Sequence, residues 1–340
     1  MIHTFSIMLT LTNQELVNLY AAYGQDFQRF DHLKSAVKWI NKSIKGVYSP
    51  ITINWVNQLA SDSWQISIKV DAVKMLSRSD IDENDYLEIE NRLQQFLLEH
   101  QIDSAAYDDH ILTRIDYKYD VCIPDVKERE LLFHIFEKQT LNYRYKKKFK
   151  WGRDKDDNPL KYETSQYHSN KSTELIIYSK EDERIAKNEN VLDYEKGIVR
   201  YELRLQNEHL NTMKRKDKST RRPKKLWAYF RIRLWEEYMI KHVYPIVHRG
   251  DYYKIAKADR IIEDSLFSKY KKAKLRAFLV EISKSDIDKP ANSVSKATYR
   301  QYLSDLELLN INPILIPKNR TDFPNSLKNP FNIEEHLSAL

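Results

Sequence analysis

Four side chains in this sequence are of the types that could transfer a phosphodiester bond. Tyr178 and Lys180 stand two residues apart, Glu202 lies in a second alternating run, and Asp116 lies in a third. A tyrosine can attack a phosphate, a lysine can stabilise the pentacovalent phosphate or lower the pKa of the phenol, and carboxylates can hold a cation that polarises the phosphate. This combination predicts a tyrosine-dependent transesterification.

Two further side chains, Asp120 and His168, are candidate ligands of such a cation beside Asp116 and Glu202. An oxygen-rich ligand set favours Mg²⁺ or Mn²⁺ over zinc. Taken singly, each residue also fits an ordinary structural role. The chain has 22 tyrosines, the two acids stand beside arginines that can pair with them, and a lone histidine near a loop is usually solvated. The prediction therefore rests on the combination.

The alternating runs that carry these residues read as β-strands, in which successive side chains point to opposite faces. In the first run Leu175 and Ile177 point one way, and Tyr178 and Lys180 point the other. The second run, 198–205, has a fully apolar face opposite Arg200, Glu202 and Arg204; that apolar face consists of Val199, Tyr201, Leu203 and Leu205. The run 112–121 alternates in the same way and carries Asp116 and Asp120.

The order of predicted elements repeats along the chain. A strand, a helix, two strands and a helix follow one another at 2–10, 13–23, 52–55, 64–70 and 83–99. A similar order starts again with the strand 112–121, a helix opened by Pro124 and Asp125, strands at 164–168 and at Tyr178, a charged helix and the Glu202 strand. We therefore predict an α+β fold with a duplicated ferredoxin-like antiparallel sheet.

The composition changes after this sheet. We expect an initiator-type nuclease domain at 1–213, a basic linker at 214–225, a helical domain at 226–322 and a loose tail at 323–340. The helical domain has predicted helices at 227–244, 254–283 and 295–309, the last capped by Ser295, and then a short apolar strand at 314–316. This order is typical of a helix-turn-helix or winged-helix module.

Two basic stretches are candidate DNA contacts. The loop 143–151 alternates cations with aromatic rings, which suits phosphate contacts and base stacking on a single strand. The start of the last helix offers three further polar side chains to a DNA groove. A solvated hairpin and an ordinary helix pair are the structural alternatives. The residues we select from these two stretches are Arg144, Lys146, Lys147, Lys148, Lys296, Thr298 and Arg300.

Composition narrows the class of protein. The five glycines form no phosphate-cradling pattern, which argues against P-loop and dinucleotide sites. The single cysteine, Cys122, excludes an intramolecular disulfide framework. The N-terminus lacks the basic region of a signal peptide, and no apolar run is long enough to cross a bilayer. We therefore expect a cytoplasmic protein that does not contact a membrane, with a net charge of +7 distributed over a highly charged surface.

Three segments carry a family resemblance: LTRIDYKYDV (112–121), YHSNKSTELIIYSKEDE (167–183) and IVRYELRL (198–205). Together they resemble the core of rolling-circle replication initiators of Gram-positive phages and plasmids, of the gene II/X-like and Rep_trans-like groups, with conjugative relaxases as more distant relatives. The resemblance covers roughly residues 65–210. It implies an HUH-like nuclease core with rearranged strand order.

The resemblance also implies roles for individual residues. Tyr178 falls on the nucleophile of a "Tyr-x-Lys" element with Lys180 in place. The family's "Arg-x-Asp" and "Arg-x-Glu" strands fall on two arginines, which we take as DNA contacts, and two acids implied as metal ligands: Arg114, Asp116, Arg200 and Glu202. Ser179 and His168 depart from the residues common at their positions. The sequence has no "His-hydrophobic-His" pair, so a two-histidine HUH site is not expected.

The expected function is initiation of rolling-circle DNA replication. Tyr178 would nick one strand of a single-stranded or hairpin origin, leaving a 5′-phosphotyrosyl bond and a free 3′-hydroxyl. Expected partners are origin DNA, a host helicase, a host DNA polymerase and a second copy of the chain that would assist termination. Two alternatives stay open: a catalytically silent DNA-binding protein that regulates copy number, and a conjugative relaxase with the same chemistry.

Overall fold

The computed structural model divides the chain into two compact units. It describes residues 1–22, 37–38, 41–42, 50–139, 146–148, 151–153, 159–161, 163–187, 189–217, 220–319 and 322–333. Unit 1 comprises Met1–Lys118, Lys171–Thr173 and Glu202–Glu237. Unit 2 comprises Tyr119–Asn170, Glu174–Tyr201 and Tyr238–Leu340. The sequence-based domain boundaries stay a prediction.

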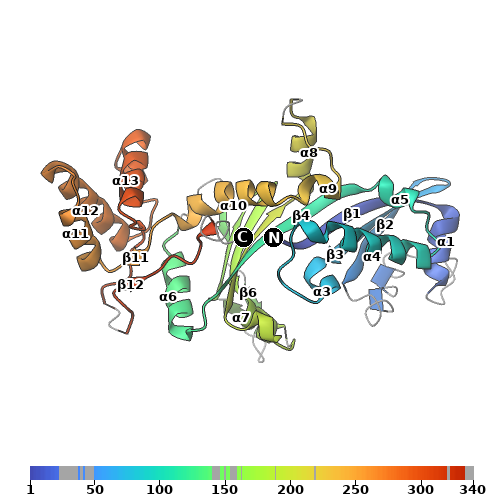
Figure 1. Cartoon of the computed structure of the whole chain (residues 1–340), viewed down its shortest axis with the longest axis horizontal. Coiled ribbons are helices and arrows are strands. Elements are labelled where there is room, and N and C mark those ends of the chain that lie inside the picture. The colour runs from blue at the N-terminus through green and yellow to red at the C-terminus, as the bar shows by residue number, and fades with distance from the viewer. Residues whose placement is uncertain are drawn as a thin grey trace. The chain divides into compact units, whose positions relative to one another are not determined.

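Unit 1 is built on an antiparallel sheet with the strand order β2-β3-β1-β4. Its helices pack on these strands, with α3 and α5 against β1 (Figure 1). The strands and helices of its first part are β1 (Ile2–Thr12), α1 (Asn13–Ala21), β2 (Ile51–Ala60), β3 (Ser63–Asp71), α3 (Ala72–Leu76), η2 (Glu83–Asp85), α4 (Tyr86–Glu99), α5 (Ala105–Asp108) and the first part of β4 (Ile111–Cys122).

Local sequence explains these elements. In β3 the residues Trp64, Ile66, Ile68 and Val70 recur at every second position, and all four are buried. Helix α1 starts at a capping box, in which Thr12 and Glu15 satisfy each other's backbone donors. Helix α4 buries one stripe at helical spacing, which consists of Ile89, Leu93, Phe96 and Leu97. The predictions for these segments are confirmed.

Unit 2 continues with β10-β9-β8-β5 as hydrogen-bonded neighbours. Strand β4 passes from unit 1 into unit 2 at residue 119, and β10 passes back into unit 1 at residue 202. The elements of this part are α6 (Val126–Phe136), β5 (Lys146–Lys148), β6 (Trp151–Arg153), β7 (Pro159–Lys161), β8 (Ser165–Ser169), β9 (Thr173–Ser179), α7 (Lys180–Ala186), η3 (Asp193–Glu195) and β10 (Ile198–Leu205).

The predicted apolar face of β10 is confirmed, since Val199, Tyr201, Leu203 and Leu205 are all fully buried. The opposite face is also buried: Arg200 is 1% exposed and Glu202 is 3% exposed. Alternation predicted the apolar face correctly. It gave no indication that the polar face would be covered as well.

The remaining elements follow β10. Helix α8 (Asn207–Arg215) and α9 (Leu226–Tyr229) belong to unit 1, and α10 (Ile232–Val247) leads from unit 1 into unit 2. The last elements, all in unit 2, are β11 (Tyr252–Tyr253), α11 (Ile255–Asp264), α12 (Lys269–Lys284), η4 (Pro290–Asn292), α13 (Lys296–Leu308) and β12 (Ser326–Leu327).

The C-terminal helices share one hydrophobic core. Leu275, Phe278 and Leu306 are buried there, and Tyr299 and Leu303 pack against them. Two expectations were wrong in detail. The helix predicted over 254–283 is divided at Ser265–Ser268, where Ser268 caps α12. The segment predicted as the strand 314–316 instead forms an isolated bridge between Ile316 and Lys254.

Residues 322–333 are packed rather than loose. Strand β12 pairs with β11, and Phe331 and Ile333 are almost completely buried. The sequence gave no local periodicity here, because these side chains fill spaces between elements that are distant in sequence.

The fold class is α+β with an antiparallel sheet, as predicted. The HUH-like core and the helix-turn-helix assignment stay predictions. None of the described helices combines the length and apolar composition needed to span a bilayer.

Candidate functional site

Asp116 is held in unit 1 by three side chains. Its carboxylate is 1% exposed and lies on β4 opposite Thr4 of β1. Thr4 Oγ1 donates to Asp116 Oδ2 at 2.5 Å, and Arg114 Nε donates to Oδ1 at 2.8 Å. Arg204 Nε donates to Oδ2 at 3.3 Å. Both oxygens therefore accept hydrogen bonds from groups on three different strands, as a buried carboxylate requires.

Glu202 is joined to Asp116 by the same arginine. Arg204 Nη2 donates to Glu202 Oε1 at 2.9 Å, and His3 Nδ1 donates to Oε2 at 2.8 Å. The two carboxylates, predicted from separate strands, thus meet around one guanidinium. We call the set His3, Thr4, Arg114, Asp116, Glu202 and Arg204 the carboxylate cluster.

His3 was not among the predicted site residues. In the pairing of β1 with β4, Ile2 faces Tyr117 and Thr4 faces Asp116, so His3 is an extra residue in a register shift. Such a bulge can redirect a side chain that strict alternation would place elsewhere. Consecutive residues therefore both reach the cluster, His3 at Glu202 and Thr4 at Asp116. Alternation alone gave no signal for this.

Lys69 lies at the edge of the carboxylate cluster. The strand register places Lys69 opposite Ser6 and Ser6 opposite Arg114. Burial lowers the pKa of Lys69, and the charge of Arg114 lowers it further, against the opposing effect of Asp116. Positive charge is therefore concentrated beside Arg114.

Tyr178 and Lys180 lie in unit 2, at the junction between β9 and α7. Tyr178 is 7% exposed, near the end of β9. Lys180 is the first residue of α7, so its predicted place on the strand was wrong. Ser179 caps this helix by accepting a hydrogen bond from the Asp182 backbone N–H at 3.3 Å. The Lys180 ammonium nevertheless stays near Tyr178, at 5.9 Å from the ring centroid.

Two carboxylates surround the Lys180 ammonium. Its Nζ donates to Glu183 Oε2 at 2.6 Å and lies 3.8 Å from Glu195 Oε1. Burial lowers the pKa of Lys180, and the charge of Arg200 contributes in the same direction. Burial raises the pKa of Glu183, but Lys180 and Lys187 outweigh it and bring that pKa down to about 2. Glu183 is therefore firmly ionised.

Glu195 anchors α7 through a second cation. Arg184 Nε lies 3.0 Å from both carboxylate oxygens, and Arg184 Nη2 donates to Oε1 at 2.6 Å. Glu195 is 1% exposed. This fork fixes α7 to the segment that leads into β10, and so fixes the position of Lys180.

Asp120 and His168 occupy other places in unit 2. Asp120 accepts two hydrogen bonds from Arg200, at 2.6 Å from Nε and 2.8 Å from Nη2. Arg200 is consequently not presented to solvent. His168 is fully buried on β8, opposite Leu175 of β9.

The four predicted metal ligands do not form one group. Asp116 and Glu202 belong to unit 1, whereas Asp120 and His168 belong to unit 2. In the part of the chain that the structure describes, no three or more His, Cys, Asp or Glu side chains are placed to hold a metal ion. The carboxylates of the cluster are paired with guanidinium groups, so in this arrangement they present no ligand set for Mg²⁺ or Mn²⁺. The cation stays a prediction.

The predicted DNA contacts fall into three groups. Lys296 and Arg300 are exposed on the first turns of α13, where Ser295 caps the helix as predicted and Thr298 contributes to the cap. Lys146, Lys147 and Lys148 form β5, and their side chains lie outside the description, as does the whole of Arg144. Arg114 belongs to the carboxylate cluster.

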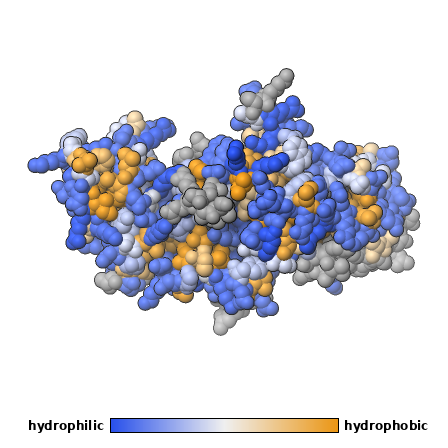
Figure 2. All heavy atoms as spheres, viewed as in Figure 1, coloured by the Kyte–Doolittle hydropathy of each residue, from blue (hydrophilic) through white to orange (hydrophobic). Residues whose placement is uncertain are grey.

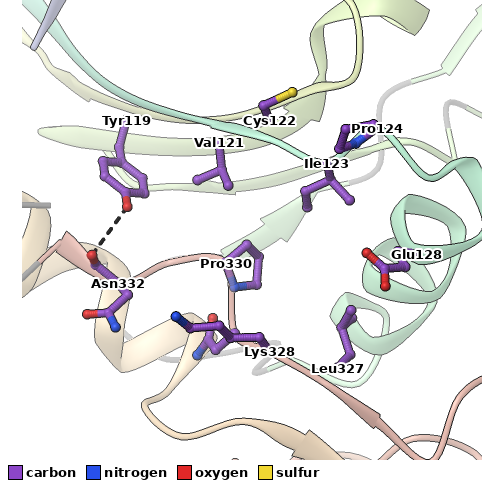
Figure 3. Close-up of a pocket in the computed structure, with 11 residues that line it drawn as sticks. Tyr119, Val121, Cys122, Ile123, Pro124, Glu128, Leu327, Lys328, Pro330 and Asn332 are labelled. Carbon is purple, nitrogen blue, oxygen red and sulfur yellow. Dashed lines mark hydrogen bonds between the residues drawn. The ribbon is translucent and has the colours of Figure 1, made fainter. Parts of the chain in front are cut away.

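Unit 2 also contains a hollow of about 480 Å³ between the end of β4, the start of α6 and residues 327–332 (Figure 3). Tyr119 and Val121 point toward Pro330 and Asn332 in this view, and Tyr119 Oη donates to the Asn332 carbonyl at 3.3 Å. The charged residues of the lining are Glu128 and Lys328. This lining offers no arrangement for nucleophilic chemistry.

Comparison with known proteins adds no identification: no protein-family model matches the sequence, and no curated protein matches it either.

Proposed function

We propose that this protein initiates rolling-circle DNA replication by nicking one strand of an origin with Tyr178. The observation that carries the proposal is the meeting of Asp116 and Glu202 around Arg204. These two acids were selected from separate strands because a phosphodiester transferase needs them. Tyr178 and Lys180 supply the other predicted elements, a phenol and an ammonium 5.9 Å from its ring centroid.

The proposed reaction is a transesterification. The Tyr178 phenol oxygen attacks the scissile phosphorus, a P–O bond to tyrosine forms, and the P–O3′ bond breaks. The phenol loses its proton and the leaving 3′-oxygen gains one, so the products are a 5′-phosphotyrosyl bond and a free 3′-hydroxyl. The number of phosphoester bonds is unchanged. Religation is the reverse reaction and needs no ATP.

Lys180 has a defined part in this proposal. Its ammonium favours the developing negative charge on the phosphate, and Glu183 and Glu195 hold it in position. A divalent cation, when bound, would polarise the phosphate as a Lewis acid. Because the carboxylates of the cluster are paired with arginines, we assign no step to such an ion.

Origin recognition is proposed for the C-terminal helices. Lys296 and Arg300 are exposed on α13 and suit contacts to DNA. A host helicase and polymerase would extend the free 3′-hydroxyl, and a second copy of the chain would supply a further tyrosine for termination. These partners follow from the proposed chemistry.

The test is covalent capture of DNA. The full chain is incubated with a labelled single strand from its own origin and Mn²⁺, and the products are separated on a denaturing gel. Wild type should form an adduct and Tyr178→Phe should form none. Tyr270→Phe is the matched control, because Tyr270 is 73% exposed on α12 and has no part in the proposed site. An adduct that persists in Tyr178→Phe refutes the nucleophile assignment.

One observation favours a second candidate, a catalytically silent DNA-binding protein. Both oxygens of Asp116 already accept hydrogen bonds from Arg114 and Thr4, as in a structural ion pair. On this alternative, wild type binds its origin but forms no adduct with any cation tested. The same gel, run beside a binding measurement, separates the two candidates.

A further inference from the structure

Unit 1 carries a basic hollow that the sequence did not single out as a site. It measures about 430 Å³ and is lined by the end of α8 and the segment that follows. Four of its lining residues are cationic and exposed, and the fifth is an asparagine. They are Asn211, Lys214, Arg215, Lys216 and Arg221. We call this set the α8 pocket.

The α8 pocket is ordered by hydrogen bonds. The segment after α8 returns along the helix, because the Arg222 N–H donates to the Met213 carbonyl at 3.2 Å. Lys224 Nζ donates to Asn211 Oδ1 at 2.9 Å, and the Leu112 N–H of β4 donates to the Lys224 carbonyl at 2.8 Å. The predicted basic linker is therefore attached to unit 1 here, and its cations are held in a defined arrangement.

The positive charge of the α8 pocket is not neutralised within the described residues. Neither Lys214, Arg215, Lys216 nor Arg221 has a carboxylate partner among them. Burial lowers the pKa of neighbouring Lys224, and the charge of Lys214 lowers it further. Four uncompensated cations on a solvent-exposed wall attract a ligand that carries several negative charges.

The place of α8 in unit 1 fits an extended ligand. Leu210 is its buried residue, and the helix stands out from the sheet of this unit with a mainly hydrophilic surface (Figures 1 and 2). Its nine residues span about 14 Å. Phosphates along one DNA strand are about 3.4 Å apart along the axis, so about four of them match this length. Only Gln206 separates α8 from β10, the strand of Glu202.

We propose that the α8 pocket binds the phosphate backbone of DNA, independently of sequence, next to the strand that carries Glu202. This inference rests on the proposed function for the identity of the polyanion. An open wall of four cations with no buried polar group suits a polymer of phosphates better than a small phosphorylated metabolite, which would need an enclosed site.

The test is the salt dependence of DNA binding by the full chain. Fluorescence anisotropy is measured between 50 and 200 mM salt with a labelled duplex and with a single strand of the same sequence. Each phosphate contact contributes about 0.9 to the log–log slope on duplex and about 0.7 on a single strand. Replacing all four cations by Gln should lower the slope by about 3 and weaken binding at 100 mM salt at least about tenfold on every sequence.

The control variant removes the same charge elsewhere. Four exposed lysines outside the α8 pocket are replaced by Gln, at Lys74, Lys127, Lys269 and Lys284. If the pocket variant and this control have the same slope and affinity on both DNA forms, the proposal is wrong. If the quadruple pocket variant does not fold, Lys216→Gln/Arg221→Gln replaces it, since both residues lie outside α8. Its expected change in slope on duplex is about 1.8.

Failure here is distinguishable from failure of the nuclease proposal. A normal slope effect with no Tyr178 adduct supports the α8 pocket and refutes the transesterase. An adduct with no slope effect refutes the α8 pocket and supports the transesterase. A larger change on duplex than on single strand identifies the DNA form that lies on α8.

Discussion

Removing Arg204 should destabilise unit 1, because this side chain joins two buried carboxylates. The Asp116 and Glu202 side chains are 1% and 4% exposed, and Arg204 donates to them at 3.3 and 2.9 Å. Arg204→Met keeps an apolar stem and removes both charge-assisted hydrogen bonds. Breaking a buried ion pair costs about 3–5 kcal/mol. Since Arg114 still holds Asp116 and His3 still holds Glu202, we expect a loss of about 2–4 kcal/mol in the free energy of unfolding.

Urea unfolding of the full chain measures this loss. Arg92→Met is the control, because Arg92 pairs with Glu88 at the surface, where both side chains are about half exposed, and should lose less than about 1 kcal/mol. Adding Glu202→Gln to Arg204→Met removes the carboxylate left without its partner. The double variant should therefore lose about 1–3 kcal/mol less than the sum of the single variants. A loss below about 0.5 kcal/mol in Arg204→Met refutes the bridging role.

Two further predictions concern unit 2. Gly250 has φ +84°, and an added Cβ would lie 2.6–2.8 Å from the backbone of the segment at Ile311. Gly250→Ala should therefore lose about 2–4 kcal/mol in thermal unfolding, and more than Gly197→Ala, whose nearest contact is 3.2 Å. Burial raises the pKa of Glu183, but Lys180 and Lys187 bring it down to about 2, so its stabilisation is present above pH 4.5 and is lost as the pH falls toward 2. Glu183→Gln should lower stability at pH 7 by about 3 kcal/mol and flatten acid unfolding over that range; an unchanged acid profile would contradict this.

The sequence predicted the elements that have strong periodicity. The alternation in β10 and β3 identified the buried face of each strand, and Ser295 identified the start of α13. Local pattern is sufficient in these cases because a strand or helix with one apolar side has only one way to face the core.

The junction after Tyr178 was wrong although the sequence held a signal for it. Ser179 is a good cap, and three acidic residues follow in the first turn of α7. Such a capping pattern indicates a helix start more strongly than a continuing alternation indicates a strand. Giving it more weight would have placed Lys180 on the helix.

Other features depend on contacts between distant segments. His3 reaches Glu202 because of a register shift in β1, and no local pattern encodes that shift. Phe331 is buried although its neighbours show no periodicity. Pairing of Asp120 with Arg200 likewise depends on two strands that are 80 residues apart.

The measurement that tests the central claim most directly is the site of the covalent bond to DNA. After incubation with the origin strand, the adduct is digested with trypsin and nuclease and analysed by mass spectrometry. The tryptic peptide 172–180, STELIIYSK, contains Tyr178 as its only tyrosine. The account predicts a nucleotide attached to this peptide through Tyr178. A nucleotide on another peptide, or an origin strand that is bound but never attached, would contradict it.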